Sequence, residues 1–170
     1  MKSKRNIVFL GMMGSGKTSI GKLTSNKLKL EFFDTDQHIE KEMKMDIPNI
    51  FEKKGENFFR DLEEKVTIDI LKKKNIVVAL GGGTFLNKGI RKEILSNHTS
   101  IWLSWNSKIL VNRIKDSIKR PLAINSSKSQ IIDLIKKRSN IYSKALYKIN
   151  CDDLSKDEIV NQVINIYETN

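Results

Sequence analysis

Short apolar segments alternate with longer segments in which apolar residues recur at helical spacing. The short segments predict strands at 6–10, 31–34, 76–80, 101–103 and 147–151. The longer ones predict helices at about 18–28, 37–45, 57–73, 88–95, 108–118, 130–142 and 156–167, with a break at Pro48. In the first helix, Ile20, Leu23 and Leu28 are expected on the inner side. This alternation is typical of an α/β protein in which a parallel sheet is covered by helices on both faces.

The ends of three predicted strands carry the residues of chemical interest. Ligands of open parallel sheets bind at the carboxyl ends of the strands. After the first strand, Gly11–Thr18 fits the pattern G-x-x-x-x-G-K-[ST], in which backbone N–H groups, a lysine and a hydroxyl hold the phosphates and Mg²⁺ of a nucleotide. Ser19 stands where a dinucleotide fingerprint needs Gly or Ala. The expected nucleotide contacts are Gly14, Ser15, Gly16, Lys17, Thr18 and Ser19.

An acidic pair follows the second predicted strand. If the strand alternation continues, Asp34 and Asp36 point in a similar direction beside the phosphate loop. One carboxylate can then help to place Mg²⁺ with Thr18, and Asp34 is the candidate, while the other accepts a proton from an attacking hydroxyl. The alternative is a helix cap, a common use of Asp ahead of a helix. A metal cluster that includes His38 is disfavoured, because the chain has two His and one Cys, and transition-metal sites need more N or S ligands.

Glycines and arginines complete the set of candidate residues. Gly81, Gly82 and Gly83 close the third predicted strand, where glycine permits close approach of backbone to a ligand. The chain has 31 Lys and Arg, only six of them Arg, and a planar fork suits carboxylate and phosphate. Arg60, Arg113, Arg120 and Arg138 are the candidates, although each taken singly could equally be a solvated surface residue.

Composition sets the broad class of protein. With 39% hydrophobic and 30% charged residues, the chain is expected to fold as one globular domain, 1–170. The net charge of +11 would suit nucleic acid, but the lysines are scattered, with no run longer than Lys72–Lys74, so a solvated surface is preferred. One cysteine excludes an internal disulfide, and no apolar run is long enough to span a membrane. We therefore expect a cytoplasmic protein.

Taken together, these residues resemble the shikimate kinases, small enzymes of the P-loop, nucleoside-monophosphate-kinase-like group. The landmarks are Gly11 to Thr18, Phe33 to Asp36, Ile50-Phe51 with Gly55-Glu56, Phe59-Arg60 with Glu63, Gly81 to Gly83, Arg120-Pro121-Leu122, and Arg138 before Tyr142. The resemblance implies a three-layer α/β/α P-loop kinase fold with a five-stranded parallel sheet and a mobile lid at about 116–129. It also implies that ATP, with Mg²⁺, phosphorylates the 3-hydroxyl of shikimate to give shikimate 3-phosphate, in the route to chorismate and aromatic amino acids.

The resemblance also assigns roles to individual residues. Asp36 falls where the family binds the substrate hydroxyls and is expected to act as the base. Arg60 and Arg138, with the glycines 81–83, fall on the shikimate carboxylate site. Lys17 and Arg120 would neutralise the transferred phosphoryl group, Arg120 from the lid, and Arg113 falls where an adenine-side arginine is expected.

Some departures and alternatives remain open. Thr84 follows the glycines where a smaller residue is frequent, and the usual adenine-side pattern is missing near 151–156, which leaves the adenine contacts there unassigned. A related kinase that acts on gluconate or a nucleotide is the nearest alternative, and a nucleic-acid-binding protein is a more distant one. The protein is expected to be a monomer whose partners are shikimate and ATP.

Overall fold

The computed structural model describes residues 5–115 and 126–169. Its centre is a sheet of five parallel strands in the order β2-β3-β1-β4-β5. The strands are β1 (Ile7–Leu10), β2 (Glu31–Asp34), β3 (Ile76–Ala79), β4 (Thr99–Ser104) and β5 (Tyr147–Asn150). The central β1 has β3 on one side and β4 on the other, so the chain changes direction across the sheet at β1. Such a switch point opens a crevice at the carboxyl ends of the strands.

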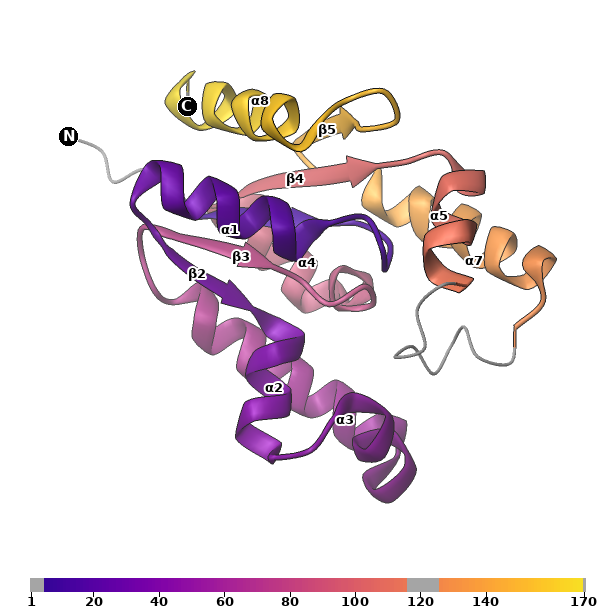
Figure 1. Ribbon diagram of the computed structural model, residues 1–170. Coiled ribbons are helices and arrows are strands. Elements are labelled where there is room, and N and C mark those ends of the chain that lie inside the picture. Colours follow the sequence, from indigo (N-terminus) through magenta and orange to yellow (C-terminus); the bar gives the residue numbers. More distant parts are fainter. Residues whose placement is uncertain (1–4, 116–125, 170) are drawn as a thin grey trace.

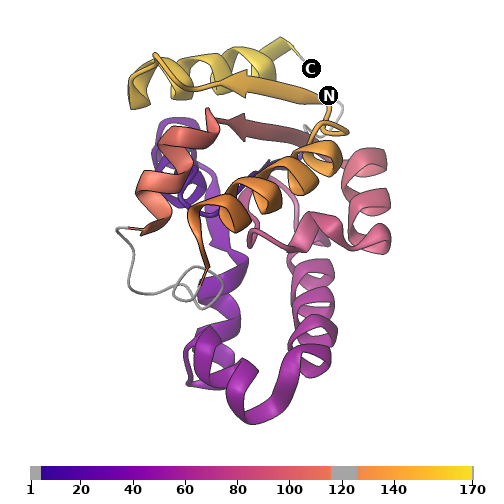
Figure 2. The same cartoon turned by 90° about the vertical axis from the view of Figure 1, so that its right-hand side faces the viewer.

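Helices cover both faces of the sheet (Figure 1). One face carries α1 (Lys17–Leu28) and α8 (Lys156–Thr169). The other carries α2 (Thr35–Met43), α3 (Ile47–Leu71), the short 3₁₀ helix η1 (Thr84–Leu86), α4 (Lys88–Asn97), α5 (Ser107–Lys115) and α7 (Lys128–Tyr142). Figure 2 shows this second layer, with α2 and the first half of α3 extending beyond the sheet. The predicted α/β class and three-layer arrangement are confirmed.

The alternation of side chains along β1 divides the core into two clusters. Ile7 and Phe9 pack with α1 and α8, while Val8 and Leu10 pack with the opposite layer. All four side chains are buried, as expected for a strand at the centre of a parallel sheet. This rigid centre fixes the loop that leaves β1, which is the predicted phosphate loop.

The ends of the helices follow from local capping. Asp34 caps α2 with its Oδ1 accepting from the N–H of Gln37 at 3.2 Å, and Asp46 caps α3, which has Pro48 in its first turn. Ser127 and Gln130 form a reciprocal capping box at the start of α7. Each cap satisfies backbone N–H groups that the helix leaves without partners.

Three details of the sequence prediction were wrong. Leu23, expected on the inner side of the first helix, is exposed. Pro48 does not break a helix but helps to begin one, and the irregularity lies instead at Gly55, whose φ of 86° and ψ of 166° bend α3. Asp36 does not continue the strand alternation after Asp34, because α2 begins at Thr35.

Most of the predicted lid, 116–129, and Arg120 within it, lie outside the described residues. Among the helices that the structure describes, none is both long enough and apolar enough to cross a membrane.

Candidate active site

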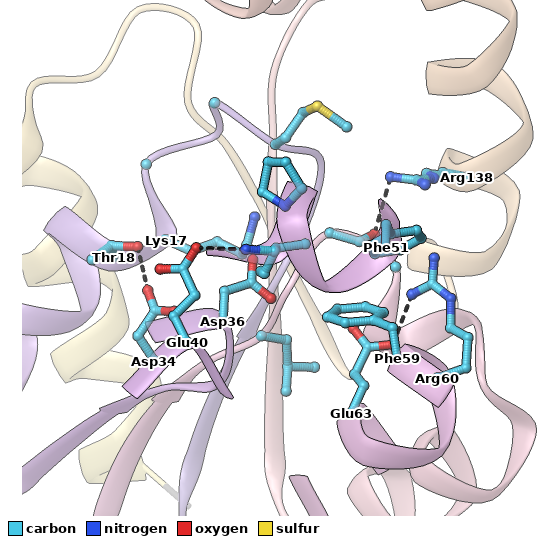
Figure 3. A pocket seen from close by; sticks show the side chains of 18 of the residues that line it. Lys17, Thr18, Asp34, Asp36, Glu40, Phe51, Phe59, Arg60, Glu63 and Arg138 are labelled. Atoms are coloured by element: carbon cyan, nitrogen blue, oxygen red, sulfur yellow. Dashed lines mark hydrogen bonds and ion pairs between the residues drawn. The ribbon is translucent and has the colours of Figure 1, made fainter. Parts of the chain in front are cut away.

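A cavity of about 550 Å³ opens at the carboxyl ends of the central strands. Its walls come from the phosphate loop, the start of α2, the first half of α3, the glycine loop after β3, and α7. In Figure 3, the acidic side chains of Asp34, Asp36 and Glu40 lie on one side of the cavity. On the other side lie two arginines and two phenylalanines, Arg60, Arg138, Phe51 and Phe59. One cavity therefore joins an anion-binding loop, carboxylates and guanidinium groups.

The phosphate loop has the backbone conformation that its glycines predict. Gly14 and Gly16 have φ values of 79° and 88°, in the left-handed region that glycine adopts without strain. The Lys17 Nζ donates to the carbonyl oxygens of Gly11 and Met12, both at 2.9 Å, and closes the loop around itself. Since α1 begins at Lys17, the positive end of that helix faces the same loop.

Asp34 is the helix cap that the sequence offered as one interpretation, and its second carboxylate oxygen lies beside Thr18. Its Oδ1 caps α2, while its Oδ2 accepts a hydrogen bond of 2.6 Å from the hydroxyl of Thr18. A hydroxyl and a carboxylate are therefore adjacent at the edge of the phosphate loop. Hard oxygen ligands of this kind, completed by phosphate oxygens and water, fit Mg²⁺. Across residues 5–115 and 126–169, no three or more His, Cys, Asp or Glu side chains are grouped to hold a metal ion.

Asp36 is the carboxylate with the most perturbed proton affinity in the cavity. Burial, with smaller contributions from the charges of Asp34 and Glu63, raises its pKa from 3.8 to about 7, and Lys17 opposes the shift. A pKa near neutrality suits a carboxylate that takes up a proton during turnover. Gly81 leaves the room for it, because a Cβ at that glycine would collide with Asp36 Oδ1.

Arg60 is held in place from three directions. Its Nη1 donates to Glu63 Oε2 at 2.7 Å, and the other oxygen of the buried Glu63 accepts from Thr84 Oγ1 at 2.7 Å. The guanidinium carbon lies 5.3 Å from the Phe59 ring centroid and 5.9 Å from that of Phe51. These contacts aim the guanidinium at the glycine loop, where a Cβ on Gly83 would come within 2.7 Å of Nη1.

Arg138 approaches the same loop from α7. Its side chain is 6% exposed, and its Nη1 donates to the carbonyl oxygen of Gly82 at 3.4 Å. The hydroxyl of the buried Tyr142 donates to this same oxygen. Within the described part of the chain, the Arg138 Nε has no hydrogen-bond partner. A buried guanidinium with a vacant donor is ready for an anionic ligand.

The structure brings together most of the predicted site residues. Those that line the cavity are Gly14, Gly16, Lys17, Thr18, Ser19, Asp34, Asp36, Arg60, Gly82, Gly83 and Arg138. Ser15 and Gly81 do not line it: Ser15 is buried, and the Gly81 N–H donates to Thr35 Oγ1 at 2.8 Å. Arg113, on α5, lies outside the cavity against the phosphate loop, with Nη1 donating to the Gly14 carbonyl at 3.4 Å.

Sequence reasoning missed two polar contacts in and beside the site. Glu40 lines the cavity one helical turn after Asp36, and its Oε1 accepts from the Ile47 N–H at 3.1 Å. The i, i+4 spacing from Asp36 was the signal that could have identified it. Trp105 donates to the Ser15 carbonyl at 2.9 Å, and nothing in the local sequence around Trp105 indicates that contact.

Comparisons with known proteins find relatives in one family. A family model described as shikimate kinase matches residues 13–168. Curated shikimate kinases of Persephonella marina and Bacillus subtilis are 39% and 40% identical to this chain, over 94% and 95% of it and 97% and 88% of their own lengths. A solved shikimate kinase from Acinetobacter baumannii, in complex with shikimate, superposes with a TM-score of 0.91 at 28% identity, covering 98% of this chain and 94% of that one. On its fold, its site and these similarities, the chain belongs to the shikimate kinase family.

Proposed function

We propose that this protein transfers the γ-phosphoryl group of ATP to the 3-hydroxyl of shikimate, giving shikimate 3-phosphate and ADP on the route to chorismate and aromatic amino acids. The observation that carries the proposal is a single cavity with a phosphate loop at one side and two arginines, Arg60 and Arg138, at the other. A small acceptor with one carboxylate and several hydroxyls matches that arrangement of charge. The shikimate bound in the Acinetobacter baumannii relative supports the same acceptor.

On the nucleotide side, the loop from Gly14 to Ser19 binds the phosphates of ATP through backbone N–H groups and Lys17. Thr18 and Asp34 would hold Mg²⁺, and the bound ion would neutralise phosphate charge. Arg113 contacts the nucleotide from α5. Arg120 is assigned to the phosphates by the family resemblance, and it lies outside the described residues.

On the acceptor side, Arg60 and Arg138 bind the carboxylate beside the glycines 81–83. Asp36 accepts a hydrogen bond from the 3-hydroxyl and fixes the attacking oxygen. As the new O–P bond forms and the bond from the γ-phosphorus to ADP breaks, the hydroxyl proton passes to the Asp36 carboxylate. A pKa of about 7 lets Asp36 be ionised before the transfer and protonated after it.

A coupled assay of ADP release tests the proposal. Purified protein is supplied with MgATP and, in separate reactions, shikimate, gluconate or a nucleoside monophosphate. Of these acceptors, only shikimate is expected to give ADP release. Turnover with gluconate or a nucleotide, and none with shikimate, would contradict the proposed acceptor.

We also propose that the protein acts as a single-domain monomer in the cytoplasm, without a nucleic-acid or membrane partner. The argument against a nucleic-acid partner is that the lysines are scattered, with no run longer than Lys72–Lys74. Light scattering after size exclusion should give one 19.6 kDa species. Filter binding near 50 mM salt, where non-specific phosphate contacts are strong, should detect no DNA or RNA.

A further inference from the structure

Trp105 joins two segments that the proposed function places on the nucleotide. It follows β4 directly and precedes α5. Its indole Nε1–H donates to the carbonyl oxygen of Ser15 at 2.9 Å, across 90 residues of sequence. Ser15 lies between the two left-handed glycines of the phosphate loop, so this bond fixes the peptide at the turn.

The same indole ring is covered by Arg113. The guanidinium carbon lies 3.8 Å from the ring centroid, which is the distance of a stacked cation–π contact. The Arg113 Nη1 also donates to the Gly14 carbonyl at 3.4 Å. Gly14, Ser15, Trp105 and Arg113 thus form a closed set of contacts at the outer wall of the phosphate loop.

The plain alternative is that Trp105 only fills space in the core. It does pack against residues of both core clusters. A leucine or phenylalanine could supply that packing, but neither offers an N–H donor, and leucine offers no aromatic face. Arg113 is exposed, and an exposed arginine loses rotamer freedom when it binds a ligand unless a neighbour already restricts it.

We propose that Trp105 is a positioning residue for ATP, which it serves by fixing the Ser15 carbonyl and by holding the Arg113 guanidinium flat against its ring. The inference rests on the proposed function only in assigning ATP to the phosphate loop. It adds a residue that acts through two others and makes no claim on the acceptor site.

Three substitutions separate the hydrogen bond from the stack. Trp105→Phe keeps an aromatic face and loses the donor, and the KM for ATP is expected to rise about 3- to 10-fold. Trp105→Leu loses both, and a rise of about 10- to 50-fold is expected. Arg113→Ala should also raise the KM for ATP. For Trp105→Phe and Trp105→Leu, kcat and the KM for shikimate should stay within 2-fold of the unmodified protein, a split that general loss of packing would not produce.

The double variant Trp105→Leu/Arg113→Ala tests whether Trp105 works through Arg113. If it does, the two effects on the KM for ATP are not additive, and the double variant falls short of the product of the single changes. Strict multiplication of the two effects would refute that part of the proposal, and an unchanged KM for ATP in Trp105→Leu would refute all of it. An equal rise in the KM for shikimate would leave only a structural role.

Fluorescence gives a readout that does not need turnover. The chain has two tryptophans, so Trp102→Phe leaves Trp105 as the only one, and Trp105→Phe leaves Trp102. Titration with MgADP should change the emission of Trp102→Phe, and the change should saturate. The emission of Trp105→Phe should change little. Emission that responds only through Trp102 would overturn the inference. The two proposals can fail separately. The proposed acceptor is wrong if the protein does not phosphorylate shikimate. This inference still stands in that case if MgADP perturbs the emission of Trp105 and Trp105→Leu weakens MgADP binding.

Discussion

Replacing Asp36 by asparagine should abolish most of the activity and make the protein more stable. The substitution keeps the shape of the protonated carboxyl group but removes the proton acceptor. Loss of a positioned base typically lowers kcat by about 10²- to 10⁴-fold. The phosphate loop is untouched, so the Kd of MgADP should stay within 2-fold. Turnover of Asp36→Asn within 5-fold of the unmodified protein would show that another group, or none, takes the proton.

The stability gain follows from the raised pKa of Asp36. Because the pKa is about 7 in the folded protein and 3.8 as its ordinary value, the folded state binds more protons than the unfolded state between these pH values. The free energy of unfolding therefore falls as pH rises from about 4 to about 7, and the full penalty of the ionised carboxylate remains above pH 7. Three pKa units correspond to roughly 4 kcal/mol, and since relaxation and water penetration reduce the effective cost of a buried charge we expect about 2 kcal/mol.

Thermal unfolding of the ligand-free protein measures this gain. At pH 8, Asp36→Asn should unfold about 4–8 °C above the unmodified protein. Near pH 4 the difference should vanish, because Asp36 is then protonated in the folded state. Asp61→Asn, at an exposed aspartate of α3, is the matched control and should leave the unfolding temperature unchanged both at pH 8 and near pH 4. If Asp36→Asn is no more stable than the unmodified protein at pH 8, the ionised Asp36 carboxylate does not destabilise the folded state.

Four further predictions concern the pH dependence of activity and the residues of the proposed shikimate site. The kcat/KM for shikimate should rise with pH through about 7 and level off above it as Asp36 ionises, and a profile flat from pH 5 to 9 would contradict this. Arg138→Lys should raise the KM for shikimate about 10- to 100-fold with the KM for ATP unchanged, because an ammonium cannot replace the planar fork; equal effects on both substrates would place Arg138 elsewhere. Tyr142→Phe removes one donor to the Gly82 carbonyl and should raise the KM for shikimate about 3- to 10-fold at nearly constant Tm, and an unaltered KM would mean that the bond is only structural. Gly81→Ala places a Cβ against Asp36 Oδ1 and should lower both kcat and Tm, whereas Gly89→Ala, on the exposed first turn of α4, should leave kcat unchanged.

The central strands β1 and β3 were predictable because a buried parallel strand is apolar on both faces. Val77 and Val78 face opposite core clusters and yet both are apolar, so the run stands out in the sequence. Leu23 was assigned to the wrong side because an exposed leucine fits the same helical spacing as a buried one. The bend at Gly55 was missed because Pro48 is the stronger local signal, although proline is also a good first-turn residue.

Some features of the candidate site could be predicted from the sequence, and others depend on the fold. The phosphate loop and the acidic pair could be predicted because a few consecutive residues carry their chemistry. The convergence of Arg60 and Arg138 on adjacent glycines depends on the strand order β2-β3-β1, which no local spacing specifies. The raised pKa of Asp36 depends first on burial and then on the charges of Asp34 and of Glu63, which is 27 residues away in the chain, so it required the fold.

A crystal structure of the protein with shikimate bound would test the central claim most directly. The account predicts the carboxylate of shikimate between the guanidinium groups of Arg60 and Arg138, and its 3-hydroxyl within hydrogen-bond distance of Asp36, facing the phosphate loop. A shikimate molecule whose carboxylate lies away from both arginines, or whose 3-hydroxyl points away from Asp36, would contradict it.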